Sequence, residues 1–494
     1  MFAPGIFLHG FGPRYDLPAP LFWYLFAAAG VVVISFVLVV AFAGEQVGSK
    51  ALQYPRRPAP FLLRLARSPW PRGIGGSIGV LTLVAIVVTG LFGSANPALN
   101  PAEYLVWIYF WVGLVILSGL VGNLWYLLNP WAAIYDFATR FVRRGPIWKF
   151  PNVGVWPAAA AYFAFACLEL TTGMANRPEV VALLALAYTA LTLAGMILFG
   201  RDEWLEHCEG FTVLFGIVGR FSPIEAERND SGAINAVYLR PWGVGLLRPI
   251  ASGWDRVFFV ILMLSTLAFD GILATPAWQD FNVALEPVWL PMGQFGFFFV
   301  RTLGMTLLTA AFLLVFVAFI ELVVFFGHRK VDFVISATGF ALTLVPIALV
   351  YNAAHYYSYF VLQSQALVPL LNDPLGKGWQ LWPAVAGIKP SFALVQVSTV
   401  WFVQIVLIVL GHVIAVYLSH LRAGERFRTA QRADARLQCG IIQTMSAATA
   451  IAASISATAI SIARLRLVPE GPRGSLVCDM TVSCGSMASC GGTA

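Results

Sequence analysis

Residues 302–326, TLGMTLLTAAFLLVFVAFIELVVFF, are apolar almost without interruption, and Glu321 is their only charged residue. An α-helix rises about 1.5 Å per residue, so about 20 apolar residues cross the hydrocarbon core of a bilayer. The alternation of apolar and polar residues that marks a membrane β-barrel is not visible in this stretch. The stretch therefore predicts a membrane-spanning helix.

Similar runs recur along the whole chain of 494 residues, which is 59% hydrophobic and only 11% charged. Soluble domains carry about 25% charged residues, so a soluble core could not hide this much apolar surface. Apolar runs lie at residues 20–43, 74–93, 104–128, 156–172, 180–199, 255–274, 302–326, 333–361 and 393–419. We therefore predict an all-α fold, a polytopic transmembrane helix bundle of about nine spanning helices, in residues 1–430.

The basic residues between these runs predict the orientation of the bundle. Lys and Arg are frequent in every second connection, at residues 44–73, 129–155, 200–254, 327–332 and 420–438. The remaining connections hold only Arg14, Arg177, Arg301, Lys377 and Lys389. Because Lys and Arg concentrate on the cytoplasmic side, we expect an N-terminus outside and a C-terminus inside the bacterial inner membrane. The net charge of +7 then reflects contact with membrane lipid, and no nucleic acid partner is expected.

Two segments depart from the simple pattern. The apolar stretch 210–218 is too short to span and is expected to lie in the interface or to re-enter the membrane. The C-terminal tail, residues 431–494, is irregular in composition, and one extra helix at 440–463 is an alternative there.

Ionisable residues inside spanning helices are costly, and each is a functional hypothesis. Orientation and helical rise place Glu169 and His355 toward the outer side, and Glu321, His412 and His420 toward the inner side. We expect Glu169, Glu321, His412 and His420 to act as a proton relay or to form hydrogen bonds between helices. Straight helices would hold His355 and His412 roughly 20 Å apart along the membrane normal, which excludes them as joint metal ligands.

His355 is the centre of the more promising site. Tyr351 and Tyr359, four residues before and after His355, share its helical face. The outer half of the bundle and the outer loops add carboxylates and a second histidine, namely His9, Asp16, Asp270, Asp280 and Asp373. This set suits metal binding or general acid–base chemistry, and a structural histidine is the competing interpretation. No P-loop or H-E-x-x-H motif occurs in the chain.

Several separated motifs across residues 8–430 carry a resemblance to a known family. They are HGFGPRYDLPAP at 9–20, LNPW at 128–131, FDG at 269–271, TPAWQD at 275–280, YNAAHY at 351–356, NDPLGKGW at 372–379 and GHV at 411–413. Together they resemble bacterial polytopic membrane proteins described as fenitrothion hydrolases. The tail does not share the resemblance, because such proteins tend to close with another apolar helix.

The resemblance implies hydrolysis of apolar aryl phosphotriesters or thiophosphates, with a divalent metal ion as cofactor and a second membrane or periplasmic subunit as partner. For this chemistry we expect His355, Tyr351 and Asp373 to be the catalytic residues. Metal ligands would come from His9, Asp16, Asp270, Asp280 and His355. One alternative is a membrane subunit whose chemistry belongs to a partner, and the other is a membrane transporter or permease with a carboxylate and histidine path. No inverted repeat is evident in the sequence to support that alternative.

Overall fold

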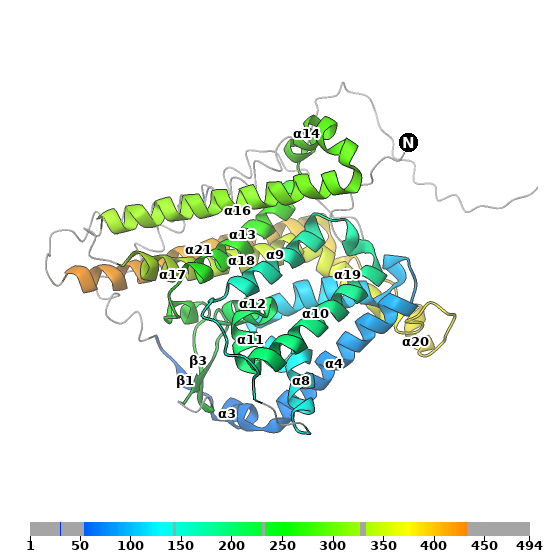
Figure 1. Ribbon diagram of the computed structural model, residues 1–494, viewed down its shortest axis with the longest axis horizontal. Helices are drawn as coiled ribbons and strands as arrows, with labels where there is room; N and C mark the ends of the chain where they lie inside the picture. Colours follow the sequence, from blue (N-terminus) through cyan, green and yellow to red (C-terminus); the bar gives the residue numbers. More distant parts are fainter. Residues whose placement is uncertain (1–29, 31–53, 142–144, 230–232, 327–331, 432–494) are drawn as a thin grey trace, which may run out of the picture.

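The computed structural model of the chain describes residues 30, 54–141, 145–229, 233–326 and 332–431. Helices make up most of this structure (Figure 1), as predicted for an all-α bundle. The first half contains β1 Arg57–Pro58, α3 Pro60–Arg67, α4 Pro69–Phe92, η1 Pro97–Leu99, α5 Pro101–Glu103, η2 Tyr104–Leu114, α6 Val115–Leu120, α7 Trp125–Leu128, α8 Pro130–Ala138, α9 Trp156–Leu170, η3 Met174–Asn176, α10 Pro178–Phe199, α11 Arg201–His207, α12 Gly210–Gly219, β2 Ile224–Arg228, β3 Ile234–Leu239 and η4 Val244–Leu247. The second half contains α13 Trp254–Leu273, α14 Pro276–Ala284, α15 Glu286–Trp289, η5 Leu290–Met292, α16 Gly293–Phe326, α17 Phe333–Thr343, α18 Val345–His355, α19 Tyr357–Leu370, α20 Pro383–Ala386, η6 Ala393–Val395 and α21 Val397–Gln431.

Seven helical stretches within the described residues are long and apolar enough to cross a membrane. They are Pro69–Phe92, Pro101–Leu120, Pro178–Phe199, Trp254–Leu273, Glu286–Phe325, Phe333–His355 and Val397–Gly424. The run predicted at 156–172 forms α9, whose 15 residues are fewer than a straight crossing requires. The run at 20–43, apart from residue 30, and the tail from 432 onward lie outside the described residues.

Helix α13 lies at the centre of the bundle. Its side chains from Val257 to Phe269 are almost all buried, and it packs against α9, α16, α17 and α18. Helix α16 runs along one side of the bundle, over α13 and α17 (Figure 1). At 34 residues it would be about 50 Å long, which exceeds a hydrocarbon core of about 30 Å.

The predicted span at 333–361 is broken twice. Helix α17 ends at Thr343 and α18 begins at Val345, with Pro346 as its second residue. Proline has no N–H to donate to the preceding turn, so a new helix start is the conformation that it tolerates best. The second break is Tyr356, which separates α18 from α19 with φ −96° and ψ 7°.

Helix α12, from the short apolar stretch, is buried inside the protein and packs against α6 and α9. Glu209 precedes it and caps its first turn, since its carboxylate accepts hydrogen bonds from the amides of Phe211 and Thr212 at 2.9 and 2.8 Å. Trp125 and Tyr188 donate to the same carboxylate at 3.0 and 2.8 Å. The buried Glu209 carboxylate therefore has hydrogen-bond partners and caps the helix.

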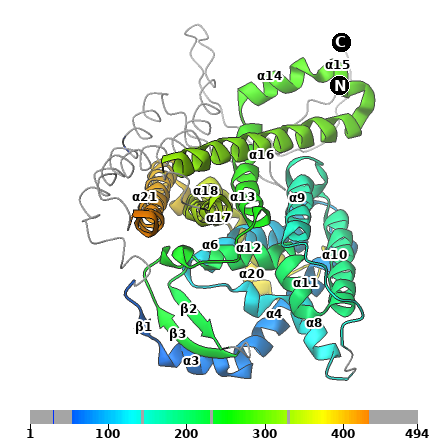
Figure 2. The ribbon, with the colours of Figure 1, turned by 60° about the vertical axis from the view of Figure 1, so that its left-hand side comes forward.

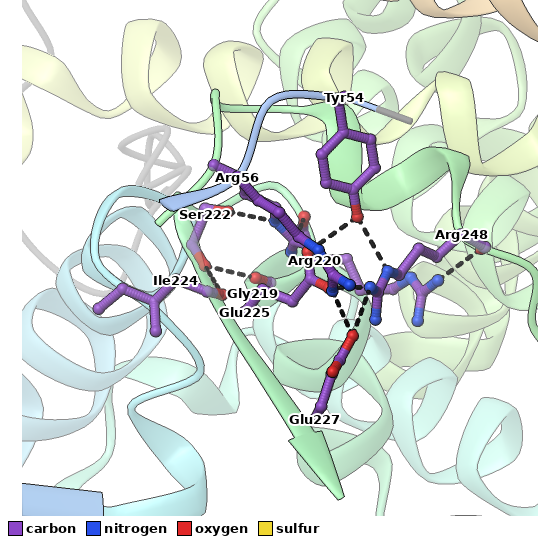
Figure 3. Close-up of polar contacts among 10 residues, drawn as sticks. Tyr54, Arg56, Gly219, Arg220, Ser222, Ile224, Glu225, Glu227 and Arg248 are labelled. Carbon is purple, nitrogen blue, oxygen red and sulfur yellow. Dashed lines mark hydrogen bonds and ion pairs between the residues drawn. The ribbon is translucent and has the colours of Figure 1, made fainter. Parts of the chain in front are cut away.

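A small antiparallel sheet, in the order β1-β3-β2, departs from the all-helical expectation. It joins two segments predicted as connections on one side of the membrane, and it lies with α3 across the bundle from α16 (Figure 2). The buried Glu225 on β2 binds Arg240 at 2.9 Å and accepts a hydrogen bond from Tyr54 at 2.8 Å. Arg56 and Arg248 pair with both Glu225 and Glu227 (Figure 3). The network ties the segment before β1 to β2.

Candidate functional site

Two ionisable side chains predicted on the outer side, Asp270 and His355, are in direct contact. Asp270 lies near the end of α13 and His355 is the last residue of α18. His355 Nε2 and Asp270 Oδ2 are 2.6 Å apart. The exposed fractions of the two side chains are 0% and 1%. Because isolated buried charges are costly, such a contact requires each group to compensate the other.

Tyr356 connects this pair to a second carboxyl group. Its hydroxyl lies 2.9 Å from Asp270 Oδ2 and 3.4 Å from Oε1 of Glu169 on α9. A phenol carries one proton, so Tyr356 donates to one carboxyl group at a time. When it donates to Asp270, a protonated Glu169 can donate to the Tyr356 oxygen. The contacts thus link α9, α13 and the junction of α18 with α19.

Aromatic rings hold His355 in its orientation. The ring of Tyr351 stacks on the imidazole with centroids 5.1 Å apart, and the ring of Tyr356 meets it edge-on at 4.8 Å. Gly271, the neighbour of Asp270, allows the Tyr351 hydroxyl to approach α13, because a Cβ at that position would lie 2.4 Å from Tyr351 Oη. Tyr351 thus packs between the histidine and the helix that carries Asp270.

The break between α18 and α19 explains how both His355 and Tyr356 reach Asp270. Adjacent residues of a continuous helix point about 100° apart and do not face the same neighbour. Tyr356 has left the helical conformation, with ψ at 7°, a backbone region where many active-site residues are found. Irregular backbone at membrane depth is tolerated where protein buries it, and it marks binding sites in several transporter folds.

The chemistry open to this group is proton transfer. Asp270 can hold the proton of His355 on Nε2, which makes Nδ1 the basic nitrogen of the ring. The carboxylate then stabilises the imidazolium that forms when Nδ1 takes a proton, as in catalytic triads. Tyr356 and Glu169 extend the chain of exchangeable protons.

The structure places the other predicted residues elsewhere. Asp280 is exposed on α14, and Glu321 is exposed on α16. His412 Nδ1 lies 2.7 Å from the carbonyl oxygen of Ile408, one turn earlier in α21. His420 is half-buried further along α21. His9 and Asp16 lie outside the described residues.

Asp373 belongs to a turn after α19. Its carboxylate accepts hydrogen bonds from the amides of Lys377 and Gly378, at 2.9 and 2.6 Å. Slight desolvation opposes the effect of these amides on the Asp373 pKa, but together the amides of residues 376–379 lower it below its usual value. Positive φ angles at Gly376 and Gly378 allow the tight turn. The carboxylate organises this loop.

A divalent metal ion needs about four to six ligands. Within the described ranges, no three His, Cys, Asp or Glu side chains gather closely enough to hold one. Asp270 and His355 are of the right ligand types, while Asp280 and Asp373 take no part in their contact.

Several buried polar residues were missed by the sequence analysis. Tyr356 lies within the YNAAHY motif but not on the helical face shared by Tyr351 and Tyr359, so helical spacing gave no reason to choose it. Glu103 is fully buried at the start of an apolar stretch and accepts a hydrogen bond from Trp107 at 2.8 Å. A carboxylate at the edge of an apolar run was the available signal for Glu103.

Comparison of the chain with protein-family models, curated proteins and solved structures finds no match. The site is therefore interpreted from its own geometry.

Proposed function

We propose that the protein is an integral protein of the bacterial inner membrane that crosses the bilayer nine times, with its N-terminus outside. Seven apolar helical stretches support most of these crossings. Helix α9, which packs against α13 in the bundle, and the apolar run at 20–43 would supply the other two. Reporter fusions at the N-terminus and after residue 431 test this topology, and a reporter active on the opposite side would refute it.

We further propose that the protein hydrolyses apolar aryl phosphotriesters or thiophosphates, and that His355 is the general base. The contact between His355 and Asp270 is the observation that carries this proposal. Nδ1 of His355 would take a proton from water while the water oxygen bonds to phosphorus and the aryl oxide leaves with the electron pair of its P–O bond. Such substrates partition into the bilayer, where the helices hold the site.

For a divalent ion, this proposal specifies only the residues that would bind it. An ion on Nδ1 of His355 would block that nitrogen as the base, so the ligands in this proposal would be Asp270 together with His9 and Asp16. A bound ion would polarise the phosphoryl oxygen. Elemental analysis of the purified protein and of an Asp270→Asn variant tests this arrangement, because loss of a ligand should lower the metal content.

His355→Ala is expected to abolish release of nitrophenol from an aryl phosphotriester by purified membranes, while insertion stays intact. Asp270→Asn should lower turnover about 10²–10⁴-fold, the usual contribution of a positioned base and its orienting group. His207→Ala, on α11 and remote from the group, is the matched control. Unchanged turnover in His355→Ala would remove this site and this activity from the proposal.

A proton-coupled transporter is the second candidate, and the contacts of Tyr356 favour it. Its hydroxyl joins Glu169 to Asp270, so carboxyl groups on two helices lie on one chain of exchangeable protons. In that case Tyr356→Phe should slow proton flux into liposomes that contain the protein. No proton flux in wild-type liposomes under a membrane potential and a range of candidate solutes would refute this candidate.

A further inference from the structure

Helix α3 is a short amphipathic helix whose apolar side chains lie on its outer surface. Phe61 and Leu65, one turn apart, share a face, and their exposed fractions are 71% and 46%. Trp70, at the start of α4, is 73% exposed. Helix α3 has no buried residue at all. Apolar side chains grouped in this way mark a surface that another molecule or a membrane covers.

The other side of α3 is fastened to the small sheet. Arg67 donates hydrogen bonds to the carbonyl oxygens of Ile234 and Asn235 at 3.0 and 2.9 Å. The amide of Ala59, just before the helix, donates to Val237 on β3 at 2.8 Å. The sheet is in turn held by the pairs of Glu225 and Glu227 (Figure 3). The orientation of α3 is therefore fixed, with Phe61 and Leu65 turned outward.

The segment that forms this surface carries only positive charges. Residues 54–102 contain five arginines and no acidic residue. Arg56 binds Glu225 and Glu227, and Arg67 binds β3. Arg57, Arg64 and Arg72 are exposed, and none of the three has a carboxylate within 4.0 Å among the described residues. Arg64 lies one turn from Phe61, so cationic and apolar groups share one surface.

The place of α3 in the chain identifies the membrane as the surface that covers it. Ser68 alone separates α3 from α4, and α4 is one of the candidate spans. Figures 1 and 2 show α3 at the start of α4, beside the sheet. A helix at the end of a span lies at the level of the lipid headgroups, where Trp and Arg side chains are both favourable.

We propose that α3, with Trp70 and Arg72, is an interfacial helix that binds phospholipids with anionic headgroups. Phe61, Leu65 and Trp70 enter the upper acyl region, while Arg57, Arg64 and Arg72 contact headgroup phosphates. Anionic lipid fits because this surface has an excess of positive charge that the described residues leave uncompensated. The inference depends on the proposed membrane location and is independent of the proposed chemistry.

Binding of fluorescent phosphatidylglycerol and phosphatidylcholine to the full-length protein in detergent tests the charge preference. Each arginine near an anionic surface contributes about fivefold to binding. Arg57→Gln, Arg64→Gln and Arg72→Gln together should weaken phosphatidylglycerol binding at least tenfold and leave phosphatidylcholine binding nearly unchanged. Equal binding of phosphatidylglycerol by this triple variant would overturn the proposal.

The matched control removes the same charge from the opposite connections, through Arg177→Gln, Lys377→Gln and Lys389→Gln. It should leave phosphatidylglycerol binding within about twofold of wild type, and a loss equal to that of the first variant would also count against α3. Thermal midpoints of both variants separate loss of binding from loss of fold. Turnover and proton flux should be unchanged in both, so failure here does not refute the proposed function.

Crosslinking in the otherwise native chain gives a second test. A photoreactive benzoylphenylalanine replaces Leu65, or Lys377 as the control, and the protein is irradiated in vesicles of equal phosphatidylglycerol and phosphatidylcholine. Mass spectrometry should find lipid adducts at position 65, with phosphatidylglycerol in excess, and few at position 377. Adducts in proportion to the vesicle composition, no lipid adducts at 65, or adducts with a protein would contradict the proposal.

Discussion

Among the described residues, a buried ionic group between the helices differs in character from one in the small sheet. His355 and Asp270 are 0% and 1% exposed, and Arg240 and Glu225 are 5% and 3% exposed. In the sheet every cation is an arginine, which stays charged at any physiological pH. Among the helices the partners are an imidazole and a phenol, whose protons can move.

This difference in partners separates a structural ion network from a chemical site. Arg240 donates to Glu225 and also to the carbonyl oxygens of Ser222 and Arg220, at 3.2 and 3.0 Å, so its charge is fixed and satisfied. Arg220 is in a similar environment: burial, together with repulsion by the arginines around it, lowers its pKa to about 10. Two pairs that are buried to a similar extent can therefore have different roles. An arginine partner makes the pair structural, whereas a histidine partner allows proton transfer.

The largest expected effect on stability is in the sheet. Glu225→Gln leaves the buried Arg240 without its compensating charge, and breaking a buried pair in this way costs about 3–5 kcal/mol. Asp270→Asn should cost less, because His355 can lose its proton and become neutral. Thermal unfolding in detergent measures both, with Glu203→Gln on the exposed side of α11 as control. A larger destabilisation by Asp270→Asn would reverse the comparison.

A smaller effect is expected where Tyr351 approaches α13. Gly271→Ala would place a Cβ 2.4 Å from Tyr351 Oη, and such overpacking typically costs about 1–3 kcal/mol. Adding Tyr351→Phe removes the clashing hydroxyl and should restore most of the thermal stability. Gly387→Ala, where no atom lies within 4 Å of the new Cβ, serves as control. No rescue by Tyr351→Phe would show that the cost arises from the backbone instead.

The helices could be predicted from sequence because hydropathy reports length and burial directly. Most of the apolar runs became helices, such as 180–199 within α10 and 255–273 within α13. The sheet was missed, because its strands Ile224–Arg228 and Ile234–Leu239 are short and lie in a segment rich in charge. Glu225 on the first of these strands binds Tyr54 and Arg56, which lie far away in the sequence.

The candidate site could be predicted only in part. Helical rise and orientation gave Glu169, Asp270 and His355 similar depths, and the structure connects the three through contacts of 2.6–3.4 Å. The depth of a residue in the membrane does not show where it lies around the bundle. Asp280 and Asp373 were therefore grouped with the site, although they lie outside it. The role of Tyr356 depends on the break between α18 and α19. No proline lies at that point, so the sequence did not predict the break.

Through Glu227 in the sheet, the stability of the protein should depend modestly on pH. A hydrogen bond from Arg56 lowers the Glu227 pKa below its ordinary value. A carboxyl group with a lowered pKa in the folded state contributes stability above its unfolded pKa of about 4.3, and loses it as the pH falls through the folded value. Because Glu227 is partly exposed, its contribution should stay under about 1 kcal/mol. Glu227→Gln should flatten the dependence of the thermal midpoint on pH below about 5, and an unaltered slope would contradict this.

The smallest effect is expected in the loop that contains Asp373. Asp373→Asn weakens the acceptors for the amides of Lys377 and Gly378, so both amides should exchange with deuterium faster while global stability stays the same. A catalytic role for Asp373, which we expected from the sequence, would instead lower turnover with little change in exchange. Measuring both in one preparation decides between them. We expect the exchange effect, because the Asp373 carboxylate is already committed to backbone amides, whereas the carboxylate of Asp270 faces groups that can pass a proton.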